Sequence, residues 1–145
     1  MKFVEVLKDL LLEQGIGIQE LSKRTGIDDS VLYDHIHGSI PQIKYAVSIA
    51  NYFNCSLNYL MGLDECPNDT EFKNNYDISF FSDRYDGLLQ ENNVTHYKLT
   101  RLCGLNYSSH YAWRHGAIPS MNSLITIANY FGTSIDYLIG RSDKK

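Results

Sequence analysis

Histidine and cysteine are the residues of this chain best able to bind a metal ion or attack a substrate. The 145 residues include five histidines and three cysteines. His35 and His37 stand two positions apart, so they do not share one face of a helix. His110 and His115 have no cysteine or carboxylate in a spacing that completes a tetrahedral set of ligands. We therefore expect no metal site and no bound cofactor, and we interpret His110 as a half-buried packing residue.

Catalytic motifs are missing from the sequence. It contains no glycine-rich phosphate loop, no GxSxG motif and no HExxH motif. Ser109 and His110 are neighbours in the chain, which does not arrange them for nucleophilic catalysis. The prediction is that the protein is not an enzyme.

The cysteines indicate a reducing compartment. Cys55, Cys66 and Cys103 are odd in number and lack CxxC spacing, which favours free thiols inside the cell over disulfides or a zinc site. No apolar run approaches the roughly 20 residues that a membrane-spanning helix needs. The first residues also lack the apolar core of a signal peptide. We expect a cytoplasmic protein without a membrane segment.

Residues 28–37 offer another kind of chemistry, which is hydrogen bonding from one face of a helix. Leu32 and Ile36 recur at helical spacing, so the polar residues between them share the opposite, exposed face. Residues 18–24 have a second helical pattern that ends near Gly26, where glycine suits a left-handed C-terminal position. Together the two segments predict a helix-turn-helix whose second helix projects a polar face.

The elements that position this face occur twice in the chain. Residues 3–62 align with residues 81–140 at an offset of 78 without a gap, with 21 identities in 60 positions. The longest identical stretches are Gly-x-Ile-Pro at residues 38–41 and 116–119 and Ile-Ala-Asn-Tyr-Phe at residues 49–53 and 127–131. A self-match of this length indicates a duplicated domain.

Helical spacing and cap residues predict five short helices in each copy and no strand. The fold class is therefore all-α. In the first copy, a helix over residues 3–14 precedes the helix-turn-helix, Pro41 begins a fourth helix and Ser56 caps a fifth. In the second copy the expected caps and breaks are Thr95, Gly104, Asn106, Gly116, Pro119, Ser134 and Gly140. The predicted organisation is one domain over residues 1–63, an acidic linker over 64–78, a second domain over 79–141 and a frayed polar tail over 142–145.

Charge is spread unevenly along the chain. The net charge is −4, which is not typical of a nucleic-acid binder. Residues 1–62 carry −2 and residues 63–80 carry −4, whereas residues 81–145 carry +2. The second copy is therefore the more favourable partner for a polyanion.

The combined motifs resemble the Cro/repressor-type (XRE-like) helix-turn-helix family of phage and bacterial transcription regulators. The first copy carries Gln-Glu-Leu-Ser-Lys-Arg-Thr-Gly-Ile at 19–27, Gly-x-Ile-Pro at 38–41 and Ile-Ala-x-x-Phe-x-x-Ser-x-x-Tyr-Leu-x-Gly at 49–62. The second copy fits at 98–105, 113–120 and 127–140. The resemblance implies two lambda-repressor-like five-helix domains in tandem, each placing its third helix in the major groove of DNA.

Matched position by position, the resemblance also implies a DNA-binding site on each copy. Its residues are Gln19, Ser30, Tyr33, His37 and Lys44 in the first copy, and Tyr97, Tyr107, Ser108, Tyr111, Arg114, His115 and Asn122 in the second. Within this set, Gln19, Lys44, Tyr97 and Asn122 are the implied phosphate contacts. Tyr107 and Tyr111 are expected on an exposed face, and Trp113 is expected to pack beneath the third helix.

Two functions stay open at this point. The first is a sequence-specific, repressor-like transcription regulator that binds double-stranded DNA chiefly through the second copy. The second is a protein-interaction module or antirepressor that keeps the fold without DNA binding, because Asp28, Asp29 and Asp34 would repel phosphates. A homodimer or another regulator protein is the protein partner considered, and no separate domain for a small molecule is evident.

Overall fold

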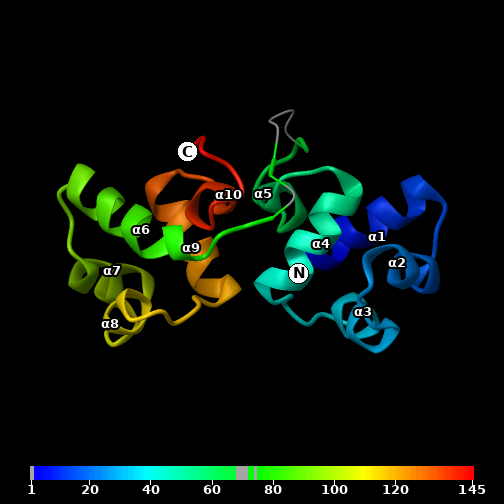
Figure 1. The fold of residues 1–145 in the computed structure, drawn as a ribbon, viewed down its shortest axis with the longest axis horizontal. Coiled ribbons are helices and arrows are strands. Elements are labelled where there is room, and N and C mark those ends of the chain that lie inside the picture. The colour runs from blue at the N-terminus through cyan, green and yellow to red at the C-terminus, as the bar shows by residue number, and fades with distance from the viewer. Residues whose placement is uncertain (1, 68–71, 74) are drawn as a thin grey trace. The chain divides into compact units, whose positions relative to one another are not determined.

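The computed structural model describes residues 2–67, 72–73 and 75–145, and these residues form ten α-helices and no strand. The all-α prediction is confirmed. The chain divides into two compact units between residues 71 and 72. The helices of the first unit are α1 (Lys2–Gln14), α2 (Ile18–Thr25), α3 (Asp29–Ile36), α4 (Ile43–Phe53) and α5 (Leu57–Leu60) (Figure 1). Those of the second unit are α6 (Ser79–Glu91), α7 (His96–Cys103), α8 (Ser109–Arg114), α9 (Met121–Phe131) and α10 (Ile135–Leu138).

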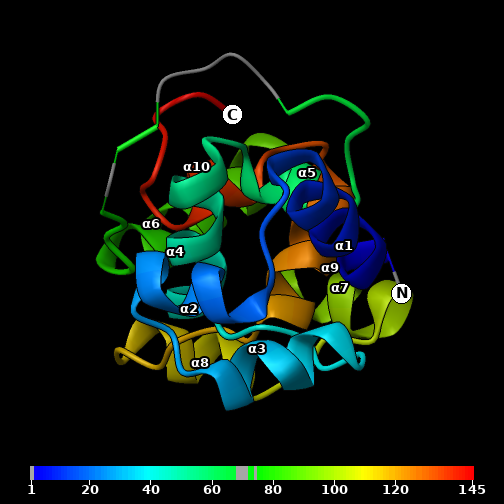
Figure 2. The ribbon, with the colours of Figure 1, turned by 90° about the vertical axis from the view of Figure 1, so that its right-hand side faces the viewer.

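The first unit is a five-helix domain built around a small apolar core. Each helix turns one apolar face inward, and the most deeply buried side chains are Phe3, Leu7, Leu21, Leu32, Ile49, Leu57 and Leu60. Helices α2 and α3 lie side by side (Figure 2). Gly26 ends α2 at φ 77° and donates its backbone N–H to the carbonyl oxygen of Ser22. This left-handed turn ends α2 and lets the chain change direction before α3, in keeping with the helix-turn-helix prediction.

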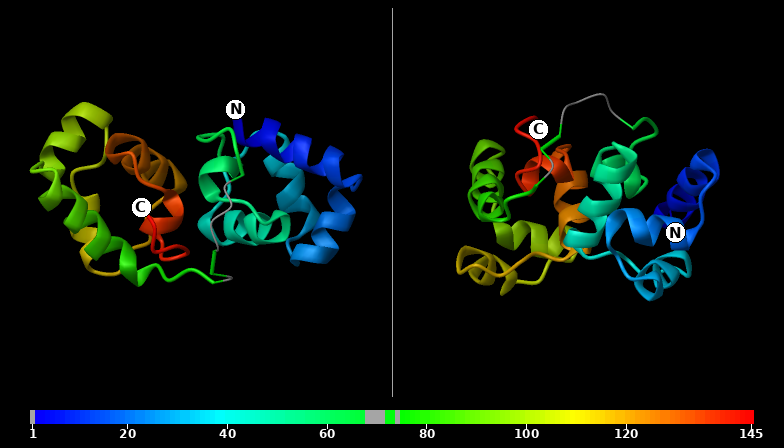
Figure 3. Two further views of the ribbon diagram at one scale, coloured as in Figure 1. Left: turned by 90° about the horizontal axis from the view of Figure 1, so that it is seen from above. Right: turned by 45° about the vertical axis from the view of Figure 1, so that its right-hand side comes forward.

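The second unit repeats the element order of the first. Helices α7, α9 and α10 begin and end 78 residues after α2, α4 and α5, which is the offset of the sequence repeat. Helix α6 packs against α8 and α10 (Figure 3). The core again consists of one inward face per helix, with Phe81, Tyr85, Leu99, Leu124, Ile135 and Leu138 fully buried.

Helix α8 begins later than the repeat predicts. The sequence indicated Asn106 as the N-cap of this helix, but the N-cap is Ser108. The side-chain oxygen of Asn106 instead accepts hydrogen bonds from the backbone N–H of Ser108 (3.0 Å) and from its hydroxyl (2.9 Å). This local turn competes with the helix, so residues 107 and 108 precede the helix as a turn.

Several other predicted caps are confirmed. The side chains of Ser56 and Ser134 accept hydrogen bonds from backbone N–H groups at the starts of α5 and α10. Thr95 caps α7 in the same way, whereas Gly17 provides no side-chain cap for α2. A side-chain cap stabilises a helix by about 1 kcal/mol. The backbone N–H groups in the first turn of α7 are therefore better supplied with hydrogen-bond acceptors than those of α2.

The described part of the expected linker packs onto the two units. The backbone N–H of Ser56 donates to the carbonyl oxygen of Pro67 in the first unit. In the second unit, Lys73 N–H donates to Arg141 O at 2.9 Å, and the guanidinium of Arg141 lies 4.3 Å from the ring centroid of Phe72. Residues 68–71 and 74 of the expected linker lie outside the described residues.

The C-terminal residues also pack instead of fraying. Ser142 is buried, and its carbonyl oxygen accepts a hydrogen bond from Arg84 of α6 at 2.8 Å. Arg84 also contacts the carboxylate of Asp143 at 3.0 Å, and Lys145 contacts Glu91 at 2.7 Å. The expected frayed tail is therefore held by side chains of α6, which the sequence pattern of residues 142–145 alone did not reveal. None of the described helices has both the length and the apolar character to cross a membrane.

Candidate nucleic-acid interface

All twelve residues that the family resemblance implied for DNA contact have solvent-exposed side chains. The tyrosines are the most prominent, with Tyr107 72% and Tyr111 70% exposed in the second unit and Tyr33 58% exposed in the first. Trp113, by contrast, is buried against Phe81 at a ring-centroid distance of 5.0 Å, as expected for a packing residue. The exposed side chains of α3 and α8 are therefore free to meet a ligand.

Each unit presents a tyrosine and a histidine one turn apart at the end of its third helix. The rings of Tyr33 and His37 have centroids 4.3 Å apart, and those of Tyr111 and His115 are 4.0 Å apart. In both pairs the histidine Nδ1 lies 2.8 Å from the backbone oxygen of the tyrosine. The two units thus hold the same exposed pair in the same geometry.

The exposed face of α3 is acidic. Asp28, Asp29 and Asp34 line a shallow depression together with Ser30 and Tyr33, and no cation lines it. Three carboxylates beside a phosphate backbone repel it, although a single carboxylate can accept a hydrogen bond from cytosine N4. The charge on this face disfavours DNA binding by the first unit.

The exposed face of α8 carries no acidic residue, but its arginine, Arg114, contacts an aspartate of α6. Arg114 Nε lies 3.2 Å from Oδ2 of Asp86 on α6, while Oδ1 of the same carboxylate accepts a 2.6 Å hydrogen bond from His110 Nε2. The side chain of Arg114 remains 55% exposed. Because Nε makes the contact with Asp86, the terminal guanidinium nitrogens are left for another ligand.

His110 of α8 and a second histidine, His96 of α7, lie next to each other, and each forms a hydrogen bond with a side chain of α6. The ring centroids of His96 and His110 are 4.7 Å apart. His96 Nε2 lies 3.0 Å from the carbonyl oxygen of Asn106, so this nitrogen carries the proton, and Nδ1 accepts a 2.7 Å hydrogen bond from the Tyr85 hydroxyl. Burial lowers the pKa of His96 and raises the pKa of Tyr85. His96 and Tyr85 therefore form a neutral, hydrogen-bonded pair in the core.

The sequence interpretation missed His96, although a signal was present. His96 stands at the position of Ile18 in the first copy, so a polar residue occupies a place where the repeat has an apolar one. The first unit has a similar exception to the apolar pattern, because His35 stands where the second unit has Trp113. His35 is buried edge-on against Phe3, with ring centroids 5.7 Å apart, and burial lowers its pKa.

The implied phosphate contacts lie around the third helices. Tyr97, near the start of α7, places its ring 6.4 Å from that of Tyr107 and 5.9 Å from the guanidinium of Arg101. Lys44 of α4 lies over the ring of Tyr45, at 4.9 Å. Gln19 and Asn122 are exposed near the starts of α2 and α9. These positions suit backbone contacts on either side of a third helix lying in a groove.

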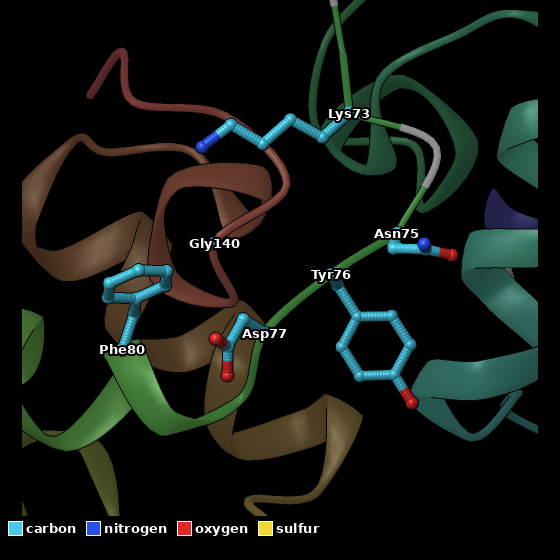
Figure 4. A pocket seen from close by; sticks show the side chains of 6 residues that line it. All are labelled: Lys73, Asn75, Tyr76, Asp77, Phe80 and Gly140. Carbon is cyan, nitrogen blue, oxygen red and sulfur yellow. The ribbon is translucent and has the colours of Figure 1, made fainter.

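A separate pocket of about 490 Å³ lies in the second unit, away from the predicted residues (Figure 4). It is lined by Lys73, Asn75, Tyr76, Asp77, Phe80 and Gly140. Its two charged groups already have partners, because Lys73 pairs with Asp143 and Asp77 accepts hydrogen bonds from Ser79. We assign no ligand to it. Among the described residues, no group of three or more histidine, cysteine or acidic side chains is placed to hold a metal ion.

Comparison with known protein families matches part of the first unit. Residues 7–60, which run from within α1 to the end of α5, match a helix-turn-helix family model. The match supports the Cro/repressor-type helix-turn-helix expected for the first copy, and it indicates a DNA-binding regulator in general. The second copy lies outside the matched residues. No curated protein and no solved structure matches the chain.

Proposed function

We propose that this chain is a sequence-specific transcription regulator that binds double-stranded DNA through two tandem helix-turn-helix domains. Helix α8 of the second unit is the principal reader of the major groove, and α3 is the weaker one. The observation that carries the proposal is the shared face of these helices. Ser30, Tyr33 and His37 recur as Ser108, Tyr111 and His115, all exposed and with matching tyrosine–histidine geometry.

The spacing of these three residues suits groove binding. In the first unit their positions, i, i+3 and i+7, follow one side of α3 to its C-cap His37. In the second unit Tyr111 lies in α8, and Ser108 and His115 are its N-cap and C-cap. A helix lying in the major groove meets base edges with such a face, and its serine, tyrosine and histidine groups can both donate and accept hydrogen bonds. Exposed side chains are free to differ between two copies without loss of stability, so their identity here favours a shared ligand.

Charge supports the second unit as the stronger DNA-binding domain. Residues 72–145 contain eight basic and six acidic residues, whereas residues 1–71 contain five basic and eleven acidic residues. Lys98 and Arg101 of α7 are exposed, and Arg114 is half exposed on α8. Because phosphate contacts supply most of the affinity for DNA, this unit has the better electrostatic match.

The test is a selection of genomic fragments by the purified full chain at low salt. The wild-type protein should enrich a short motif, and Arg114→Ala should weaken binding by about tenfold and lower the salt dependence by about one counterion. Lys144→Ala is the matched control, because it removes one exposed charge near the C-terminus without touching α8. Equal losses of DNA affinity in the two variants would contradict a specific role for Arg114. If the wild-type protein enriched no motif at any salt concentration, sequence-specific DNA binding itself would be contradicted.

The acidic face of α3 favours a second candidate function for the first unit. Its exposed carboxylates suit a basic surface on another regulator protein better than they suit phosphates. Under this alternative the domain is an interaction module or antirepressor. The double variant Asp29→Asn/Asp34→Asn separates the two functions. Stronger DNA binding by this variant would favour a DNA-facing α3, whereas unchanged DNA binding with loss of a captured protein partner would favour the interaction module.

A further inference from the structure

The hydrogen bonds of His37 and His115 fix which ring nitrogen carries the proton. Nδ1 lies 2.8 Å from the backbone oxygen of Tyr33 in one unit and of Tyr111 in the other. A carbonyl oxygen can only accept a hydrogen bond, so Nδ1 must be the protonated nitrogen. In the neutral ring, Nε2 is then an acceptor with no proton to donate.

The same contacts fix the direction of Nε2. Each ring packs against the tyrosine one turn earlier, with interplanar angles of 36° for His37 and 25° for His115. Because Nδ1 faces the carbonyl of its own helix, Nε2 lies on the side of the ring away from that carbonyl. Both histidines are exposed. Each therefore presents a bare acceptor to whatever approaches the end of the third helix.

Charged groups near the two rings do not change this assignment. Glu5 and Lys8 of α1 line the same depression as His37, which places one acid and one base beside it. Next to His115, the charge of Arg114 is balanced by Asp86 of α6. The hydrogen bond to the backbone, which is the same in both units, remains the contact that decides the tautomer.

A bare acceptor distinguishes among base edges in the major groove. Cytosine presents the N4 amine and adenine the N6 amine as donors, whereas guanine presents only the acceptors N7 and O6, and thymine the acceptor O4 with a methyl group. We infer that His37 and His115 each select an adenine or a cytosine by accepting a hydrogen bond at Nε2 from its exocyclic amine. This inference rests on the proposed DNA-binding function and specifies the ligand chemistry at one position of each site.

The shared face has a consequence for the whole DNA site. Because the serine, tyrosine and histidine are the same in both units, the two half-sites have a common core. Asp29 and Asp34 of α3 are replaced by Tyr107 and Ala112 in the second copy, so the flanking bases differ. The binding site is a pair of related but unequal elements, each with adenine or cytosine opposite the histidine.

The experiment is a selection from random duplexes with the full chain at pH 8, above the range in which histidine normally takes up its second proton. Wild type is compared with His115→Ala, which removes the acceptor, and with His115→Lys, which supplies a donor in its place. His37→Ala is the matched control in the other unit. Both histidines are exposed, so these variants are expected to keep the fold, and circular dichroism checks this.

We expect wild type to enrich two related elements and to prefer adenine or cytosine over guanine by about tenfold at one position in each. His115→Ala should abolish that preference in one element, His37→Ala should abolish it in the other, and His115→Lys should turn it toward guanine. A wild-type motif with guanine at these positions, or a motif unaltered by His115→Ala, would overturn the inference while leaving DNA binding intact. Absence of any wild-type enrichment would overturn the proposed function and this inference with it.

Discussion

Arg114 Nε at the end of α8 lies 3.2 Å from Oδ2 of Asp86 on α6. The contact joins the main cation of the exposed α8 face to the scaffold beneath it. The first unit has nothing equivalent, because Lys8 and Ile36 occupy the matching positions. Asp86 both orients Arg114 and offsets its charge, so it opposes the attraction of this arginine to a phosphate.

Replacing Asp86 by asparagine should therefore strengthen DNA binding. An ion pair at this degree of exposure contributes up to about 1 kcal/mol, which corresponds to a gain of up to about fivefold in affinity at low salt. Fluorescence anisotropy with a labelled duplex at two salt concentrations measures the change. Asp83→Asn, an equal change of charge at an exposed position on the same helix, is the control. An equal gain from Asp83→Asn would mean that net charge, and not release of Arg114, is responsible.

The buried histidines should make the stability of the protein depend on pH. Burial lowers the pKa of His35 and of His96 below the ordinary value of 6.5, so the unfolded chain binds more protons than the folded one in mildly acidic solution. Their contribution to the free energy of unfolding is complete above about pH 6.5 and falls as the pH drops below it. Urea denaturation at a series of pH values between 8 and 5 measures this loss.

A single variant isolates the contribution of the first unit to this loss of stability at low pH. His35→Phe keeps an aromatic ring against Phe3 and removes the titrating group, so the loss of stability below pH 6.5 should become smaller. His37→Phe is the matched control, because His37 is exposed and two residues away. If His35→Phe and wild type lose stability equally on acidification, burial of His35 is not a source of the pH dependence.

A buried ion pair in the second unit should be sensitive to the loss of either partner. Arg141 and Asp136 are both 1% exposed, and their side chains meet at 2.6 Å. Asp136→Asn removes the negative charge that faces this buried guanidinium, and we expect a loss of about 3–5 kcal/mol in the free energy of unfolding. Chemical denaturation followed by circular dichroism is the measurement.

The sequence of the first unit suggests a double variant in which both members of this ion pair lose their charge. Asn58 and Leu63 occupy the positions of Asp136 and Arg141 there, so the double variant Asp136→Asn/Arg141→Leu reproduces a combination that the fold already accommodates. We expect the double variant to be more stable than Asp136→Asn alone. If it is no more stable, then the packing of Arg141 on Phe72, and not the loss of the Asp136 charge, dominates.

Trp113 should be the most sensitive aromatic residue of α8. It is buried against Phe81 and Tyr85, with ring-centroid distances of 5.0 and 5.4 Å. Trp113→Ala should reduce the free energy of unfolding by about 3–5 kcal/mol. Tyr107→Ala removes an aromatic ring that is 72% exposed, so it should change stability by less than about 0.5 kcal/mol. Similar losses in the two variants, measured by thermal denaturation, would contradict this division between core and surface.

The sequence by itself determined the all-α class, the helix order and most of the helix ends. These features depend on interactions between residues a few positions apart. The caps Ser56, Thr95 and Ser134 bond to backbone N–H groups three residues later, and Gly26 ends α2 through its own backbone conformation. Because the sequence is duplicated, each helical pattern could be compared between two copies. The same comparison indicated which exposed residues in and around α3 recur in and around α8.

Tertiary structure decided the contacts that join distant segments. Asp86 meets Arg114 and His110, Tyr85 meets His96, and Arg84 holds the last residues of the chain. Each of these pairs brings together different helices or a helix and a terminus. Helical periodicity states which residues face inward, but it does not state which side chain of another helix each will meet. That choice follows from how the helices cross, and only the folded chain shows that Arg114 reaches back to α6 while His115 stays on the exposed face.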